Sequence, residues 1–274
     1  MTGPVEVTDA ALSLDVAREA GRLLIDVRRS FGALDPHDRE RSRLLRDTAD
    51  REAHLLIERR LASARPEDVL LSEEGIGDDT RLSAARVWIV DPLDGTWEYG
   101  QGRDDFAVHV ALWTRTDGAV GVLSAATVDL PSQGTTYSVL DDVAAPGAIP
   151  TDRPVRVVVS RSRRPVDLDG VTHRLAVALQ ESGGSALGVE VVQVGSVGAK
   201  AAEVFAGRAE IYLHDSGFSD WDLAAPLGIA LHRGLWCTAP GGGGFTFNGP
   251  GLVQPGIVMV IPALADAVRA AVRG

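Results

Sequence analysis

Residues 85–96 read ARVWIVDPLDGT, and this stretch decides how the rest of the chain is interpreted. Its apolar run ends abruptly in Asp91, which is typical of a buried strand that delivers a side chain at its end. Pro92 fixes φ and has no N–H group, so it favours a sharp turn after the strand. Asp91 and Asp94 can then converge on one point, with the Leu93 carbonyl facing the same way.

A second pair of acids, Glu73 and Glu74, ends the preceding apolar run, VLLSEEG at 69–75. Two carboxylates about 4 Å apart repel by about 4 kcal/mol at an effective dielectric constant of 20. Such a cluster must take up a proton, pair with Arg or Lys, or bind a cation. No basic residue lies between Glu73 and Glu74 or between Asp91 and Thr96, so a cation is favoured. Oxygen ligands without His or Cys indicate Mg²⁺ rather than zinc or copper.

Gly95 and Thr96 follow the acids at the predicted start of a short helix. Their free backbone N–H groups predict a seat for phosphate. A cation beside a phosphate seat indicates metal-assisted hydrolysis. An isolated Asp-Gly pair would be interpreted as a plain turn, and an isolated Asp91 as a strand-end cap. The two acidic motifs together favour a catalytic site.

Composition excludes several other classes of protein. The chain has 274 residues, 45% of them hydrophobic, and 27 basic against 38 acidic residues give a net charge of −11. This charge disfavours nucleic acid and anionic membranes as partners. A single cysteine, Cys237, excludes an internal disulfide and a cysteine-rich zinc site. The N-terminus lacks the apolar run of a signal peptide, and no stretch reaches the about 18 apolar residues of a membrane helix. We expect a cytoplasmic protein.

The first half is predicted to be α+β. An apolar stripe through Leu12, Val16, Ala20, Leu23, Val27 and Phe31 predicts a helix capped by Thr8 and ended by Gly32. The charged stretch 35–47, with arginines from Arg39 to Arg46, is interpreted as a solvated loop or a mobile flap over an anionic substrate. A second helix is expected over 48–62. Antiparallel strands follow, joined by turns at Asp117-Gly118 and Pro131-Ser132.

The second half is predicted to be α/β, because short apolar runs alternate with helical patterns. Helices are expected at about 170–182, 197–206 and 222–233 and at the C-terminus. The proline-rich stretch 141–154 is interpreted as a linker, which gives an N-terminal domain over 1–145 and a C-terminal domain over 146–274. His109 alternates within an apolar strand and is interpreted as a core residue.

The motifs SEEG, WIVDPLDGT and Trp221-Asp222 resemble, in order and spacing, those of the inositol monophosphatase superfamily of Mg²⁺-dependent, lithium-sensitive phosphatases. The resemblance covers essentially the whole chain. The continuation DGTWEY is similar to the D-G-T-x-E-[FY] of the CysQ-type phosphatases that act on 3′-phosphoadenosine 5′-phosphate (PAP). SRS at 160–162 and GSVGAK at 195–200 resemble the nucleotide-side motifs of that branch.

The resemblance implies a layered αβαβα sandwich of the inositol monophosphatase and fructose-1,6-bisphosphatase type, usually a homodimer, with two or three Mg²⁺ ions. Glu73, Asp91 and the Leu93 carbonyl would hold one ion, and Asp91, Asp94 and Asp222 a second. Asp50 and Thr96 would orient the attacking water, while Gly95 and Thr96 bind the scissile phosphate. The candidates for the nucleotide side are Ser160, Arg163, Ser196 and Lys200.

Three positions depart from the family pattern. Asp47 stands where the family has a hydroxyl residue, Arg163 where some relatives have histidine, and Asp220 where a basic residue often precedes the Trp-Asp pair. The first affects details of water activation, and the other two affect substrate preference. The expected substrate is PAP, and with it the sulfated relative PAPS, in sulfur metabolism. The alternatives are a broader phosphatase for inositol monophosphate or fructose 1,6-bisphosphate and a non-catalytic metal or nucleotide sensor.

Overall fold

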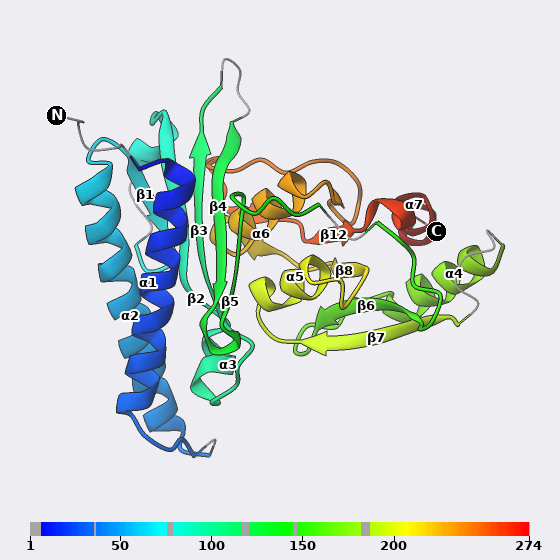
Figure 1. Cartoon of the computed structure of the whole chain (residues 1–274), viewed down its shortest axis with the longest axis horizontal. Helices are drawn as coiled ribbons and strands as arrows, with labels where there is room; N and C mark the ends of the chain where they lie inside the picture. Colours follow the sequence, from blue (N-terminus) through cyan, green and yellow to red (C-terminus); the bar gives the residue numbers. More distant parts are fainter. Residues whose placement is uncertain are drawn as a thin grey trace.

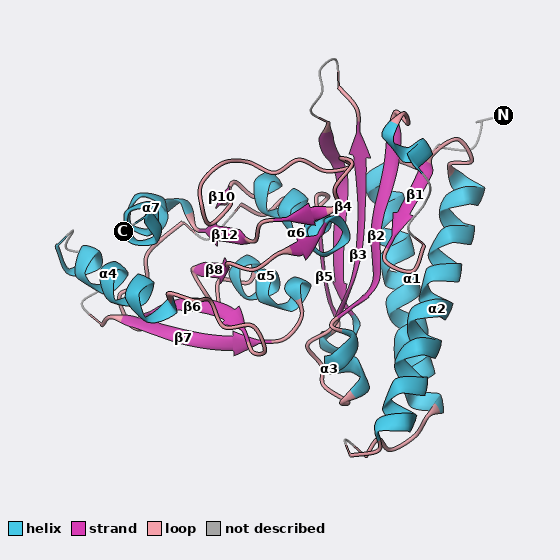
Figure 2. Cartoon of the chain, turned by 180° about the vertical axis from the view of Figure 1, so that it is seen from behind, coloured by secondary structure: helices cyan, strands magenta, loops and turns pink. Residues whose placement is uncertain are grey.

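A computed structural model describes residues 7–35, 37–75, 79–116, 121–144, 147–181 and 187–273. The expected turn at Asp117-Gly118 lies outside these residues. Five layers stack across the molecule, as Figures 1 and 2 show from opposite sides. In order they are a helix pair, a sheet, a second helix pair, a second sheet and a third helix pair. The αβαβα sandwich expected from the sequence is therefore confirmed. No described helix is long and apolar enough to cross a membrane.

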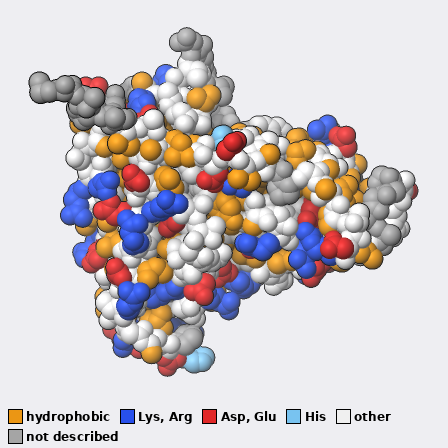
Figure 3. All heavy atoms as spheres, in the orientation of Figure 1, with side chains coloured by type: hydrophobic (Ala, Val, Ile, Leu, Met, Phe, Trp, Pro, Cys, Tyr) orange, Lys and Arg blue, Asp and Glu red, His pale blue; other side chains and the backbone are white. Residues whose placement is uncertain are grey.

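The first layer is a pair of long helices, α1 (Asp9–Ser30) and α2 (Arg39–Ala64). The Thr8 side chain caps α1 by accepting the Ala11 N–H at 3.2 Å, and Gly32 follows the helix with φ +70°, so both predicted ends are confirmed. In Figure 3 the basic side chains over this face are interspersed with acidic ones. Arg29 and Asp26, for example, lie 2.8 Å apart, so the helix pair does not present a one-signed basic surface.

The expected loop over 35–47 is wrong from residue 39 onwards, because α2 begins at Arg39. Asp38 caps this helix by accepting the Arg41 N–H at 3.0 Å. Arg, Glu and Leu are good helix formers, and a helix exposed on most sides can carry many charges. Ser42 and Leu45 face inward, and the Ser42 hydroxyl donates to the Gly100 carbonyl at 2.9 Å. The charged stretch is therefore a helical wall and not a loop.

The second layer is a five-stranded sheet in the order β1-β2-β3-β4-β5. β1 is parallel to β2, and the other pairs are antiparallel. The short helix α3 follows β2, and a 3₁₀ turn at Pro131–Gln133 joins β4 to β5, as expected. The bounds of these elements are β1 Val69–Ser72, β2 Arg86–Asp94, α3 Thr96–Gly100, β3 Ala107–Thr114, β4 Val122–Leu130 and β5 Thr135–Ser138.

The remaining layers belong to the second half of the chain. Helices α5 (Val197–Phe205) and α6 (Asp220–His232) lie between the two sheets, and α4 (Leu168–Glu181) and α7 (Ala265–Arg273) cover the outer face. The second sheet has the order β10-β12-β8-β6-β7, and β9 pairs with β11. The strands are β6 Val155–Ser160, β7 Val189–Val194, β8 Ile211–His214, β9 Phe218–Ser219, β10 Trp236–Thr238, β11 Val253–Gln254 and β12 Ile257–Val260.

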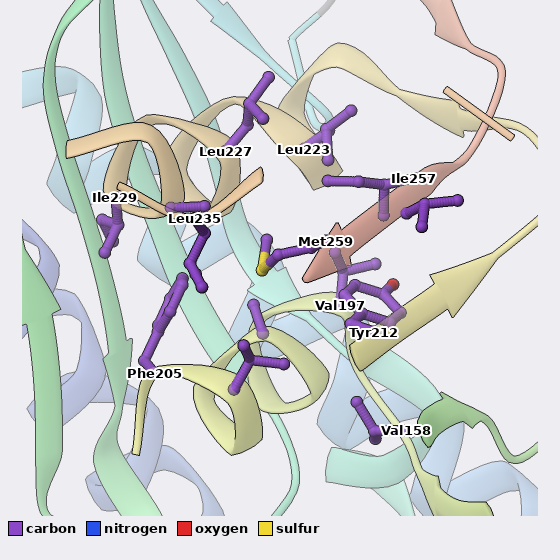
Figure 4. Packing of buried hydrophobic residues seen from close by; sticks show 14 of the residues in the cluster. Val158, Val197, Phe205, Tyr212, Leu223, Leu227, Ile229, Leu235, Ile257 and Met259 are labelled. Carbon is purple, nitrogen blue, oxygen red and sulfur yellow. The ribbon is translucent and has the colours of Figure 1, made fainter. Parts of the chain in front are cut away.

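Two buried clusters hold the layers together. One fills the space between α1, α2 and the first sheet, and the larger one joins both sheets through α5 and α6. Figure 4 shows Phe205, Leu235 and Met259 from this larger cluster pointing toward one another. The boundary between the predicted domains falls in the connection from β5 to β6, whose described residues form no helix or strand. The shared cluster fixes the first turns of α5 and α6 against the end of β2.

Candidate metal and phosphate site

A cavity of about 520 Å³ opens where the end of β2 meets the first turns of α5 and α6. The loops after β6 and β7 complete its wall, and the arrowhead of β7 points toward α3 in both views (Figures 1 and 2). All but one of the site residues predicted from the sequence line it. The residues that line the cavity include Glu73, Asp91, Leu93, Asp94, Gly95, Thr96, Trp97, Glu98, Ser160, Arg161, Arg163, Ser196, Lys200, His214, Phe218 and Asp222.

Three carboxylates converge in the wall of the cavity. Asp91 and Asp94 lie at the end of β2, where the pairing with β3 shifts register between these two residues. Asp222 comes from the first turn of α6, more than a hundred residues along the chain. One carboxylate oxygen from each of the three lies within 4.8 Å of the others. An all-oxygen group of this kind fits a hard divalent cation, Mg²⁺ above all.

Burial and mutual repulsion act on these acids together. Burial, with the nearby Glu73 and Asp94 carboxylates, holds the pKa of Asp91 well above its usual value. Burial and Asp94 raise the pKa of Asp222 to about 6. Glu73 lies at the exposed rim, outside the group of three, yet burial of its carboxylate and the field of Asp222 raise its pKa to about 7. A bound cation would relieve this repulsion.

Asp94 behaves differently because donors surround it. Its oxygens accept the Val197 N–H at 3.1 Å and the Gly198 N–H at 2.7 Å, both from the start of α5. His109 Nε2 lies 3.2 Å from Asp94 Oδ2. Burial alone would raise the pKa of Asp94, but His109 and the Gly198 amide outweigh it and lower the pKa to about 2. Asp94 therefore stays charged and fixed in place.

The role of His109 was not recognised in the sequence. Its burial was predicted correctly, since it is fully buried in β3, but its contact with Asp94 was not. The antiparallel pairing places His109 opposite Asp91, so the register of β2 and β3 carried the missing signal. A Cβ added at Gly198 would lie 2.4 Å from His109 Nε2, so only glycine fits at this contact.

Asp50 and Thr96, the expected water-orienting pair, come from different layers. Asp50 lies on α2 behind the cavity wall and is 7% exposed, and its Oδ1 has no hydrogen-bond partner among the described residues. Burial, with Glu74 and Glu73, raises its pKa to about 8. The Thr96 hydroxyl lines the cavity and donates to the Leu93 carbonyl at 3.1 Å. An unpartnered buried carboxyl oxygen fits a role for Asp50 toward water or a cation.

The four candidates for the nucleotide side all line the cavity. Ser160 accepts the Arg163 N–H at 3.1 Å and so shapes the loop after β6. Ser196 is the N-cap of α5 and accepts the Ala199 N–H at 3.0 Å. Lys200 is only 2% exposed, and its Nζ donates to the Gly195 and Ser196 carbonyls. Burial lowers the pKa of Lys200 to about 8.

Asp220, which stands where a basic residue often precedes the Trp-Asp pair in the family, is fully buried. One of its oxygens accepts Gln254 Nε2 at 2.6 Å and the other accepts the Asn248 N–H at 2.8 Å. The Asn248 side chain in turn accepts from Arg81 Nη1 at 3.0 Å. This network anchors the start of α6, which carries Asp222.

Gly95 allows the close approach of α3 to α5, and its replacement is a direct test of this geometry. Its φ is +86°, and an added Cβ would lie 2.7 Å from Ser196 Cβ. We expect Gly95→Ala to lower the free energy of unfolding by about 3 kcal/mol, from left-handed strain and overpacking together. Gly134 has φ +61° and open space around it, so Gly134→Ala should cost only about 1–2 kcal/mol. Equal losses in urea unfolding would contradict the close contact.

Comparison with known proteins agrees with this geometry. The model of the inositol monophosphatase family matches residues 6–264. The chain belongs to the inositol monophosphatase family. A 3′-phosphoadenosine 5′-phosphate phosphatase of Mycobacterium leprae is 39% identical over 96% of this chain and 94% of its own length. An inositol-1-monophosphatase of Rhizobium meliloti is 31% identical over 72% of each chain.

A solved structure of a family member has the same architecture. The superposition with the crystal structure of CysQ from Bacteroides thetaiotaomicron covers 93% of this chain and 97% of the CysQ chain. The TM-score is 0.70 and the sequence identity is 25%. Family membership means a phosphomonoesterase whose acidic cluster binds a divalent metal, and Asp91, Asp94 and Asp222 provide that cluster here.

Proposed function

We propose that this inositol monophosphatase family member hydrolyses the 3′-phosphate of PAP, and with it PAPS, using Mg²⁺ bound by Glu73, Asp91, the Leu93 carbonyl, Asp94 and Asp222. The convergence of Asp91, Asp94 and Asp222 within 4.8 Å, in a cavity that also holds arginines, carries the proposal. The 39% identity to a PAP phosphatase over nearly the whole chain supports the choice of substrate.

The divalent cations supply charge neutralisation and activation of water when they are bound. The chain's own residues do the rest. Asp94 is held by two backbone amides, so it needs no rearrangement to keep its charge in position. Asp50, whose buried Oδ1 has no partner among the described residues, and the Thr96 hydroxyl would orient the attacking water. Gly95 and Thr96 line the same cavity, and their backbone N–H groups would bind the scissile phosphate.

PAP carries a second phosphate, which needs a cation away from the acidic end. Of the arginines in the loop after β6, Arg161 pairs with Asp105 at 2.6 Å, and Arg164 pairs with Asp169. Arg163 is exposed in the cavity, and within the described part of the chain no carboxylate pairs with it. Its charge nevertheless acts on Asp222 and His214. Arg163 is therefore the residue best placed to bind the second phosphate, ahead of the buried Lys200.

Phosphate release from PAP, inositol 1-phosphate and fructose 1,6-bisphosphate with Mg²⁺ tests the proposal. We expect PAP to have the highest kcat/KM. Arg163→Ala should lower kcat/KM for PAP about ten- to a hundredfold, the value of a charged hydrogen bond, and leave inositol 1-phosphate nearly unchanged. Arg164→Ala, which removes an equal charge next to it, should affect neither substrate.

Two outcomes would contradict parts of the proposal. Equal losses on PAP and inositol 1-phosphate would mean that Arg163 supports the metal site or the loop instead. A wild-type preference for inositol 1-phosphate would favour the broader phosphatase, in line with the inositol-1-monophosphatase of Rhizobium meliloti. No release from any substrate would favour a sensor. The homodimer, the cytoplasmic location, lithium sensitivity and a count of two or three Mg²⁺ ions are part of the same proposal.

A further inference from the structure

Trp97 is an exposed aromatic residue in the wall of the cavity. It is 51% exposed, and among the described residues no other tryptophan, tyrosine or phenylalanine is exposed to a similar degree. The other rings in the cavity wall, Phe218 and His214, are only 4% and 3% exposed. Leaving an indole in water forgoes the free energy that its burial would contribute. An aromatic ring exposed at a cavity wall is therefore a candidate surface for a flat ligand.

The neighbours of Trp97 hold the ring without covering it. The next residues of α3, Glu98 and Tyr99, are buried, so the short helix is anchored from its other side. The Arg103 guanidinium lies 5.6 Å from the centroid of the indole ring, a cation–π distance. Arg103 therefore lies over one face of the ring, and the side chain is still 51% exposed despite this contact.

The position of Trp97 also fits a nucleotide. It directly follows Thr96, whose hydroxyl lies at the reacting end of the cavity 3.1 Å from the Leu93 carbonyl. In PAP the base and the scissile 3′-phosphate are attached to the same ribose. When that phosphate is at the reacting end, the base is therefore no farther away than the length of one nucleoside. In the D-G-T-x-E-[FY] motif this residue occupies the unspecified position, so the motif does not explain a tryptophan there.

We propose that the free face of the Trp97 indole is the surface on which the purine base of the substrate stacks. The inference rests on the proposed nucleotide substrate and adds a residue that selects for the base. Stacking of a base on an aromatic side chain is tolerant of base identity and typically lowers Kd by about tenfold or more. Arg103 stabilises the indole in the orientation that receives the base.

The test measures binding of adenosine 5′-monophosphate and ribose 5-phosphate, which differ only by the base. In calorimetric titrations Trp97→Leu should raise the Kd of adenosine 5′-monophosphate about tenfold or more and leave that of ribose 5-phosphate unchanged. Trp97→Phe should restore most of the difference. Adenosine 5′-monophosphate should also quench tryptophan emission in wild type and much less in Trp97→Phe.

Trp236 offers a matched control. It also lies under an arginine, with Arg269 at 5.1 Å from its ring centroid, but it lines a different pocket. Trp236→Leu should leave both dissociation constants unchanged. Unchanged binding of adenosine 5′-monophosphate to Trp97→Leu would overturn the inference, and so would equal losses for both ligands.

Kinetics separate this inference from the proposed function. With PAP, Trp97→Leu should raise KM and leave kcat nearly unchanged, while inositol 1-phosphate hydrolysis is unaffected. If wild type hydrolyses PAP and Trp97→Leu has the same KM, the stacking inference fails and the proposed function stands. If wild type does not hydrolyse PAP, the proposed function fails, and the binding experiment still decides whether Trp97 contacts the base.

Discussion

Asp222→Asn is expected to lower kcat by more than about 100-fold. Mutation of residues that only hydrogen-bond to metal ligands already costs about 10–100-fold in activity or metal affinity, and Asp222 is a direct ligand in the proposed site. Asp94→Asn should have an effect of the same order. In metal-free protein at pH 8, however, Asp222→Asn should raise the free energy of unfolding by up to about 3 kcal/mol. The reason is that burial and Asp94 oppose the charge of Asp222 and raise its pKa to about 6.

Asp220→Asn is the matched control, two residues earlier on the same helix. Both oxygens of Asp220 accept hydrogen bonds, from Gln254 and Asn248, and an amide can accept only one of them. We expect this variant to lose about 1–3 kcal/mol of stability and to keep its kcat within a few-fold. Asp222→Asn should therefore lose turnover and gain stability in the metal-free protein, whereas Asp220→Asn should lose stability and keep most of its turnover. An Asp222→Asn enzyme with nearly full turnover would remove Asp222 from the proposed metal site.

The acidic site was predictable because its ligands follow short apolar runs that end abruptly. Asp91 and Asp94 are close in sequence and are carried on one strand, so the local pattern alone places them together. The layered fold followed from the resemblance of the three motifs and from the alternation of strands and helices. Each of these signals is local or depends on a fixed order of motifs.

The features that were missed depend on contacts between distant residues or on a choice between two local states. The first turns of α2 were predicted as a loop because their charges hide the inward-facing Ser42 and Leu45. His109 was assigned to the core because only the pairing of β2 with β3 brings it to Asp94. Trp97 carried no periodic signal, since α3 has only one and a half turns and its exposed side is set by the anchoring of Glu98 and Tyr99.

Removal of divalent metal should make the stability of the protein depend strongly on pH. Burial and neighbouring acids raise the pKa of Asp50 to about 8 and of Asp222 to about 6, and hold that of Asp91 well above its usual value. The folded state therefore binds more protons than the unfolded chain between about pH 4 and pH 8. Stability from these groups is fully present below pH 4 and is lost as the pH rises through the folded pKa values. In EDTA we expect the free energy of unfolding to fall by at least about 2 kcal/mol from pH 6 to pH 8.

Mg²⁺ should reverse this loss, because it binds the same carboxylates in competition with protons. At 100 times its Kd it would add about 2.7 kcal/mol, and the increase in melting temperature should be larger at pH 8 than at pH 6. Asp91→Asn should lose most of this increase. Asp129 is also a buried acid, and burial raises its pKa to about 6, but it lies on β4 outside the cavity. Asp129→Asn should therefore weaken the pH dependence in EDTA mainly between about pH 4 and pH 6 and leave the effect of Mg²⁺ intact. An equal Mg²⁺ effect in wild type and Asp91→Asn would contradict a cation at the end of β2.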